Sequence, residues 1–116
     1  MTRIYGEAAL DAVPAAIDNA TLFLRVEDCT RADACALTIV EHRIAGISRA
    51  AGNTDPVQFA LMLPAPPAGP GWTLRASLCQ DPSGNLRQGD YVSNRRYAVG
   101  GSAAGRPLRI MLHRLA

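Results

Sequence analysis

Large apolar residues recur at every second position in four segments of this chain. In the segment 57–63 they are Val57, Phe59, Leu61 and Leu63. The segments 22–27, 72–79 and 108–113 show the same alternation. Successive side chains of a β-strand point to opposite faces, so each segment would bury one face and expose the other. The pattern therefore predicts four half-buried strands.

Three further segments predict strands of less regular form. Arg3–Leu10 has the length and composition of a short edge strand. Ala36–Ile44 has apolar residues at both odd and even positions, which predicts a β-bulge near Ile39–Val40. Leu86–Val99 is long and contains Gly89, so we expect a bend near Gly89–Asp90.

The connecting segments contain residues typical of turns and loops. Asp81–Asn85 reads Asp-Pro-Ser-Gly-Asn and predicts a hairpin turn that makes the strands on its two sides antiparallel neighbours. Residues 64–71 are rich in proline and should run extended in solvent, and the glycine-rich residues 100–105 should be flexible. Residues 8–20 are rich in alanine, but Pro14 and the lack of a helical period argue against a helix. We predict an all-β fold, a single-domain antiparallel β-sandwich of about seven strands over residues 1–116.

Composition excludes several classes of protein. A chain of 116 residues has the size of one domain, and its 48% apolar residues exclude a disordered chain. No run approaches the 18 apolar residues of a transmembrane helix. The net charge of +2 is too small to indicate a nucleic-acid partner. All twelve basic residues are arginine, so lysine-based covalent catalysis is also excluded.

The three cysteines show no metal-binding pattern. Cys29, Cys35 and Cys79 lack paired C-x-x-C spacing and nearby histidines, so we expect no metal and no cofactor. Cys29 and Cys35 are spaced so that a disulfide could close one short connection. The alternative is that all three are small buried apolar residues. The sequence leaves both interpretations open.

No arrangement typical of catalysis is present. His42 follows Glu41 within a predicted strand, so the two side chains point to opposite faces and form no local dyad. The G-x-S-x-G motif that presents a nucleophilic serine is missing. We therefore expect no catalytic residues and no enzymatic activity.

The loop with Asp28, Thr30 and Asp33 is the best candidate for a functional group of side chains. Two carboxylates and a hydroxyl within six residues could contribute ligands to calcium, but calcium needs about six or seven oxygens. Asp and Thr side chains also accept backbone hydrogen bonds and shape turns. We interpret the three residues as a structural loop.

Arg87, Arg95 and Arg96 are the strongest candidates for binding a partner. They lie in the same predicted segment, and a guanidinium group matches the geometry of a carboxylate. The hypothesis is a clamp for an acidic partner. The alternative is an ordinary solvated strand face.

The segment Leu24–Ala34, which reads LRVEDCTRADA, resembles the acidic-loop signature of the YbaY/YscW-type lipoprotein family, also called type III secretion lipoprotein chaperones. The resemblance continues through 38–44, 56–61, 72–99 and 108–112, and so covers nearly the whole chain. It implies a seven-stranded β-sandwich that is exported to the bacterial periplasm and anchored by an N-terminal lipid. Some members of that family are pilotins, which help an outer-membrane secretin to reach its destination.

The resemblance implies a non-catalytic chaperone module of the cell envelope, with an outer-membrane or secreted protein as its partner. It also implies a periplasmic or outer-membrane-associated location. The first residues show neither a leader nor a lipobox, so membrane contact would need a lipid anchor absent from this chain, and a cytoplasmic location stays open.

Two modes of binding follow from this interpretation. In the first, an extended partner segment pairs with an exposed sheet edge, for which we expect Arg3–Leu10, or lies in a groove between the sheets. In the second, the sandwich has no protein partner and holds a lipid or carbohydrate in an enclosed pocket.

Overall fold

The computed structural model describes residues 2–28, 37–64, 71–99 and 106–115. All regular elements in these ranges are β-strands, which confirms the all-β prediction. They are β1 (Thr2–Leu10), β2 (Ile17–Asp28), β3 (Leu37–Arg49), β4 (Val57–Leu63), β5 (Trp72–Cys79), β6 (Tyr91–Ser93), β7 (Tyr97–Ala98) and β8 (Leu108–Arg114). Across the described ranges, no helix has the length and apolarity needed to cross a membrane.

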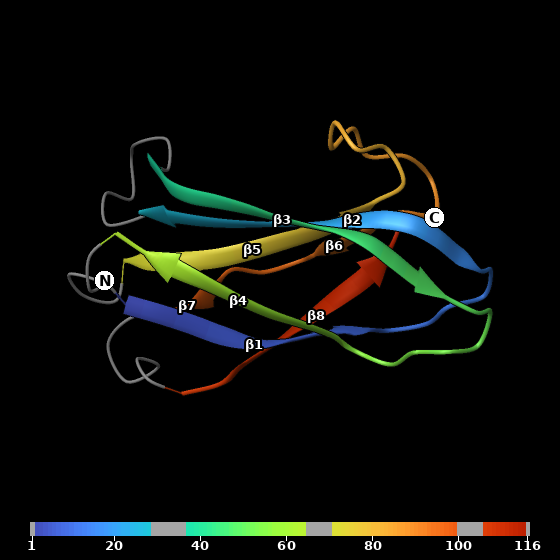
Figure 1. Cartoon of the computed structure of the whole chain (residues 1–116), viewed down its shortest axis with the longest axis horizontal. Helices are drawn as coiled ribbons and strands as arrows, with labels where there is room; N and C mark the ends of the chain where they lie inside the picture. Colours follow the sequence, from blue (N-terminus) through green and yellow to red (C-terminus); the bar gives the residue numbers. More distant parts are fainter. Residues whose placement is uncertain (1, 29–36, 65–70, 100–105, 116) are drawn as a thin grey trace.

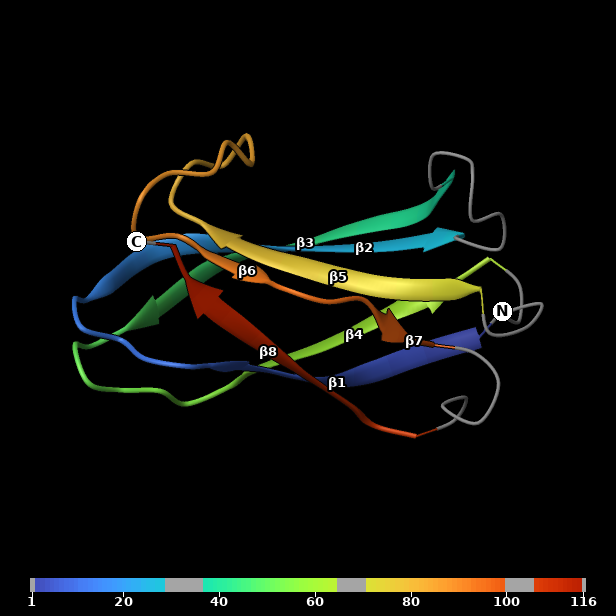
Figure 2. The same ribbon diagram turned by 180° about the vertical axis from the view of Figure 1, so that it is seen from behind.

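The eight strands form one sheet rather than the two sheets of a sandwich. Its order is β3-β2-β5-β6-β8-β1-β4, and β7 pairs separately with β5. The sheet rolls into a nearly closed, barrel-like shape, with β3, β2 and β5 in one layer and β8, β1 and β4 in the other (Figures 1 and 2). The predicted sandwich is corrected in this respect, because the short strand β6 pairs with both β5 and β8 and keeps the two layers continuous.

The strands are also not all antiparallel. β1 and β8 lie side by side and parallel, with Gly6 opposite Leu108 and Leu10 opposite Leu112. Every other pairing is antiparallel. Local patterns do not specify which strands from the two ends of a chain become neighbours, so the sequence offered no signal for this pair.

The apolar core lies between the two layers. β4 alternates as predicted, with Val57, Phe59, Leu61 and Leu63 buried. The facing layer contributes residues from β2 and β5 that sit opposite each other in register: Leu22 with Leu78, Leu24 with Ala76, and Val26 with Leu74. The period-two prediction is therefore confirmed for the inward positions of these three strands.

Arg3–Leu10 is a strand, but the prediction that it lies at an edge is wrong. β1 pairs with β4 over residues 2–8 and with β8 over residues 6–10, so it lies inside the sheet. The two ends of the sheet are instead β3 and β4, and their outer edges are free.

The predicted bulge and bend are both present. Val26 pairs with Val40 and Glu27 with Thr38, so Ile39 is the extra residue of β3. In the segment 86–99 only β6 and β7 are strands, and Gly89, with φ of 91°, lies in the turn before β6. A continuous strand from Leu86 is therefore not formed.

The connection between β5 and β6 contains the predicted turn. Gly84 has φ of 89°, and its N–H donates to the carbonyl oxygen of Asp81 at 3.0 Å. β5 and β6 are antiparallel neighbours, as expected from a hairpin. Most of the proline-rich and glycine-rich segments, at 65–70 and 100–105, lies outside the described residues.

Candidate partner-binding surfaces

The two ends of the sheet, β3 and β4, approach each other without pairing in the ranges that the structure describes. We call this place, between the free edges of the two strands, the seam. In Figure 1 the seam is on the side of the molecule that faces the reader. An unpaired strand edge presents N–H and C=O groups that can accept an added strand. The seam is thus the candidate site for edge pairing in place of Arg3–Leu10.

The β3 side of the seam carries features that oppose edge pairing. Its middle is charged, with Glu41 and Arg43 both exposed. The register shifts at the extra residue Ile39 and again near Gly46, which has φ of 76°. Charges and bulges on an edge strand prevent the approach of another strand. β3 is therefore a poor template.

The β4 side of the seam lacks these features. β4 reads Val-Gln-Phe-Ala-Leu-Met-Leu, without charge, proline or glycine, and pairs with β1 in unbroken register from Leu63–Thr2 to Val57–Ala8. Met62 on its outer side is 45% exposed and lies opposite Arg3 of β1, and Tyr5, opposite Ala60, is 37% exposed. A regular, neutral edge next to exposed apolar side chains is the more suitable template for an extended segment.

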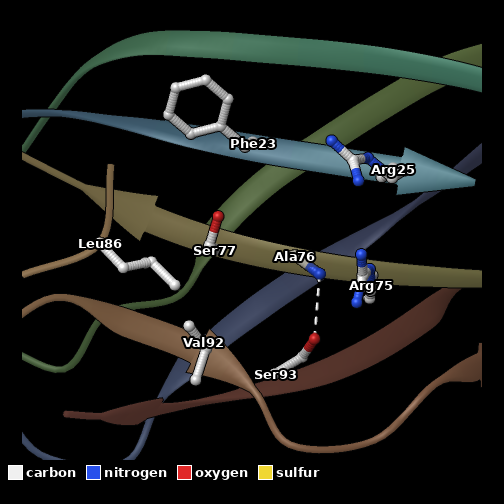
Figure 3. Close-up of a pocket in the computed structure, with 8 residues that line it drawn as sticks. All are labelled: Phe23, Arg25, Arg75, Ala76, Ser77, Leu86, Val92 and Ser93. Carbon is white, nitrogen blue, oxygen red and sulfur yellow. Dashed lines mark hydrogen bonds between the residues drawn. The ribbon is translucent and has the colours of Figure 1, made fainter. Parts of the chain in front are cut away.

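A second candidate surface lies on the outward side of β2 and β5. We call it the Phe23 face, and it comprises Phe23, Arg25, Arg75, Ser77, Leu86 and Val92, which line an open depression of about 240 Å³ (Figure 3). Phe23 lies opposite Ser77 in register, and Arg25 lies opposite Arg75. At the floor, the N–H of Ala76 donates to Oγ of Ser93 at 3.0 Å. Alternation in β2 and β5 places these side chains outside the core.

The arginines of this face are oriented by carboxylates. Nη2 of Arg25 lies 2.6 Å from Oε1 of Glu41, and Nε of Arg75 lies 2.9 Å from Oε1 of Glu27. Glu41 is exposed, whereas Glu27 is only 4% exposed. The first pair is solvated and contributes little to stability. The second holds a buried carboxylate, so Arg75 is the more firmly placed of the two arginines.

The loop that borders the Phe23 face is organised by the buried carboxylate of Asp90. Its Oδ1 accepts from the N–H of Gln80 at 3.2 Å, and its Oδ2 accepts from the N–H of Arg87 at 2.9 Å. Its carbonyl oxygen accepts from the N–H of Leu115 at 2.7 Å, which ties the loop to the end of β8. Asp90 therefore fixes the loop that carries Leu86.

Replacing Asp90 with alanine is expected to lower the free energy of unfolding by about 3 kcal/mol, because two hydrogen bonds to a charged group are lost. Urea denaturation of the two proteins measures the change. Asp18→Ala is the matched control, since Asp18 is an exposed aspartate in β2 and its loss should cost less than about 0.5 kcal/mol. A loss below about 1 kcal/mol for Asp90→Ala would contradict this role of the carboxylate.

The three arginines of the predicted clamp are exposed but do not share one strand. Arg87 lies in the loop before β6, with its Nη2 3.3 Å from Oδ2 of Asp81. Arg95 and Arg96 follow β6, and the guanidinium of Arg95 lies 4.5 Å from the ring centroid of Tyr97. All three arginines thus have interactions within the chain. Binding of an acidic partner by the three arginines stays a prediction.

The acidic loop falls mostly outside the described residues. Thr30 and Asp33 lie there, together with Cys29 and Cys35, so the loop and disulfide interpretations stay untested. Asp28 is the last residue of β2. Cys79 is a free and fully buried cysteine, and burial raises the pKa of its thiol. Its thiol is therefore protonated at neutral pH, as expected for a small core residue.

Asp81, Tyr91 and His113 have partners within the fold. Hydrogen bonds from Ser83 lower the pKa of Asp81 in the turn, and burial raises the pKa of Tyr91, whose hydroxyl donates to the carbonyl oxygen of Ala12 at 2.6 Å. Nδ1 of His113 lies 3.4 Å from Oδ2 of Asp11 at the surface. No three His, Cys, Asp or Glu side chains of the described ranges are grouped so as to hold a metal ion.

Comparison with known proteins identifies a similar fold. No protein-family model and no curated protein sequence matches this chain. Among solved structures, the chain is similar to an alternative pilotin from the type II secretion system of Vibrio cholerae, with a TM-score of 0.74 and 22% sequence identity. The match covers 99% of this chain and 97% of that one. The likeness supports a pilotin-like fold, whereas membership of the YbaY/YscW-type family stays a prediction.

Proposed function

We propose that this protein is a non-catalytic, pilotin-like chaperone module that binds an extended segment of an outer-membrane secretion protein in a bacterial cell envelope. The observation that carries the proposal is the likeness of fold, over almost the full length of both chains, to a protein described as a pilotin of a secretion system. The proposal includes an envelope or outer-membrane-associated location.

The free edge of β4 supports a specific mode of binding. The partner segment would lie in the seam and pair its backbone N–H and C=O groups with those of β4. Its side chains on the outer side would lie near Met62 and Tyr5, which are both exposed. Strand addition relies mainly on the backbone, so this mode would tolerate variation in the partner sequence.

The alternative of a lipid or carbohydrate carrier has less support. It requires an enclosed pocket with a few convergent polar groups. The depressions that the described residues form at the Phe23 face and at its neighbour beside β3 are open to solvent. These open surfaces favour a protein partner.

Affinity capture from the outer-membrane fraction of the native host, read by mass spectrometry, tests the proposal. The wild-type chain is expected to capture an outer-membrane secretion protein, and Met62→Lys is expected to lose most of it, because a lysine on an edge strand opposes the addition of another strand. Ala98→Lys is the matched control. It also replaces an exposed apolar residue with lysine, but Ala98 lies in β7, outside both the seam and the Phe23 face.

Two results would count against the proposal in different ways. If no outer-membrane secretion protein is captured, the chaperone function is wrong. If such a protein is captured equally by the wild type and by Met62→Lys, the function stands and binding at β4 is wrong. Hydrogen exchange of the captured complex separates the cases directly, since strand addition should slow exchange of the amides in residues 57–63.

A further inference from the structure

Two arginines are neighbours on the Phe23 face, and each has one carboxylate beside it. Arg25 on β2 and Arg75 on β5 are directly opposite each other in register. Like charges at such positions destabilise a sheet. The ion pair with Glu41 lies on the β3 side of Arg25, and Glu27 lies two residues farther along β2. Figure 3 shows the two arginine side chains next to each other at one end of the depression.

The other end of the depression is apolar. Phe23 lies two residues from Arg25 along β2, which is a separation of about 7 Å in a strand. Leu86, which is 50% exposed, and Val92 complete this apolar part from the loop and from β6. Arg43 of β3 packs its guanidinium 5.2 Å from the ring centroid of Phe23. The face therefore offers an apolar surface beside a pair of cations.

The charges of this face define what it can bind. The charged side chains on this face and next to it are Arg25, Arg43 and Arg75, with the exposed carboxylate of Glu41 and the buried carboxylate of Glu27, so the cations exceed the carboxylates by one. The guanidinium of Arg75 has five N–H donors. Its Nε lies 2.9 Å from Oε1 of Glu27 as an ion pair, but that oxygen accepts no hydrogen bond from the residues that the structure describes. A carboxylate placed between Arg25 and Arg75 would accept hydrogen bonds from both and would relieve their repulsion.

We propose that the Phe23 face is a second recognition site, which binds a polypeptide segment that presents an aspartate or glutamate beside a large apolar side chain. The carboxylate lies between Arg25 and Arg75, and the apolar side chain packs on Phe23 and Leu86. This inference goes beyond the proposed function, because it neither uses the seam nor requires a secretion partner.

Recognition at this face relies on side chains. β2 is already paired with β3 and β5, and β5 is paired with β2 and β6. Their backbone groups are therefore not available to an added strand, in contrast to those of β4. The site is selective for sequence, because the carboxylate and the apolar side chain must match the spacing of the arginines and Phe23.

Selection of phage-displayed random dodecapeptides on the immobilised full chain tests the proposal. The enriched peptides are expected to share an acidic residue next to a large apolar one. For the best peptide, synthesised with a fluorescent label, Arg25→Gln and Arg75→Gln are each expected to weaken binding about tenfold or more in anisotropy titrations. Arg109→Gln is the matched control, because Arg109 is an exposed arginine paired with Glu7 at 3.5 Å on the other layer. It should change the affinity by less than about twofold.

The binding test can be carried out even if Arg75→Gln does not fold. Arg75→Gln leaves the buried Glu27 without its cation, so the double variant Arg75→Gln with Glu27→Gln replaces it if the single variant does not fold. Arg25→Gln disturbs only a solvated pair and should fold as the wild type does.

Three results would overturn the proposal: no enriched peptides, enriched peptides without acidic residues, or equal binding by Arg25→Gln and the wild type. Amide chemical shifts of the protein give a fourth such result, which is that the labelled peptide perturbs residues 57–63 rather than residues 23–25 and 75–77. That outcome would place the peptide in the seam and leave the proposed function intact. Conversely, capture of a secretion protein that depends on Met62 has no bearing on the Phe23 face.

Discussion

Replacing Gly6 with alanine is expected to destabilise the protein by about 3 kcal/mol or more, because the new methyl group has no space. Gly6 lies in β1 where β8 begins, opposite Leu108. A Cβ atom at Gly6 would lie 2.7 Å from the backbone N and C of Leu108 and closer still to its carbonyl oxygen. Only backbone atoms are in the way, so no change of rotamer can relieve the contact. The free energy of unfolding from urea denaturation measures the loss, and complete failure to fold would agree with it.

Gly46→Ala is the control for this variant. Gly46 has φ of 76° and no atoms within 4 Å of an added Cβ, so alanine there carries only the backbone cost of about 1–2 kcal/mol. Gly6→Ala should therefore destabilise the protein more than Gly46→Ala. If Gly6→Ala unfolds within about 1 kcal/mol of the wild type, the close parallel packing of β1 against β8 is wrong.

Replacing Phe59 with alanine is expected to cost about 3–5 kcal/mol of unfolding free energy, since a large core side chain is removed and a cavity remains. Phe59 is 5% exposed and lies on the inward side of β4, opposite Gly6 of β1. Phe59 belongs to the same buried cluster as Ile4, Leu61 and Ile110, and a close-packed core relaxes only partly around a cavity.

Gln58→Ala is the matched control in the same strand. Gln58 is exposed and its Nε2 donates to Oε2 of Glu7 at 3.3 Å, so its loss should cost less than about 0.5 kcal/mol. A change below about 1 kcal/mol for Phe59→Ala would mean that the inward parity of β4 is wrong. The two variants together test the alternation on which the whole sequence interpretation rests.

Local features of the fold could be predicted because their causes are local. The alternation of Val57, Phe59, Leu61 and Leu63 follows from the geometry of one strand, whatever its neighbours are. The extra residue Ile39 could be located because a bulge changes the parity of apolar residues within the same segment. Gly84 and Gly89 adopt positive φ in turns, which glycine accepts without strain.

The binding surfaces could not be predicted in the same way. The sequence indicates that Arg25 and Arg75 point outward, but only the register of β2 and β5 places them opposite each other. Asp90 has no local pattern that reveals its role, because it binds the amides of Gln80 and Arg87 and its own carbonyl oxygen accepts from Leu115. The sequence points to Arg87, Arg95 and Arg96 because they are close in the chain, but closeness in the chain does not determine closeness on the surface.

The period of a few neighbouring residues is enough to predict that the chain forms strands, where most of them lie, and which of their side chains face the core. The arrangement of the strands in one rolled sheet, with β1 inside it and β3 and β4 at its free edges, cannot be read from these local periods. Hydrogen bonds between strands join backbone groups that are the same in every residue. Their partners are therefore selected by the packing of the whole core rather than by any segment alone.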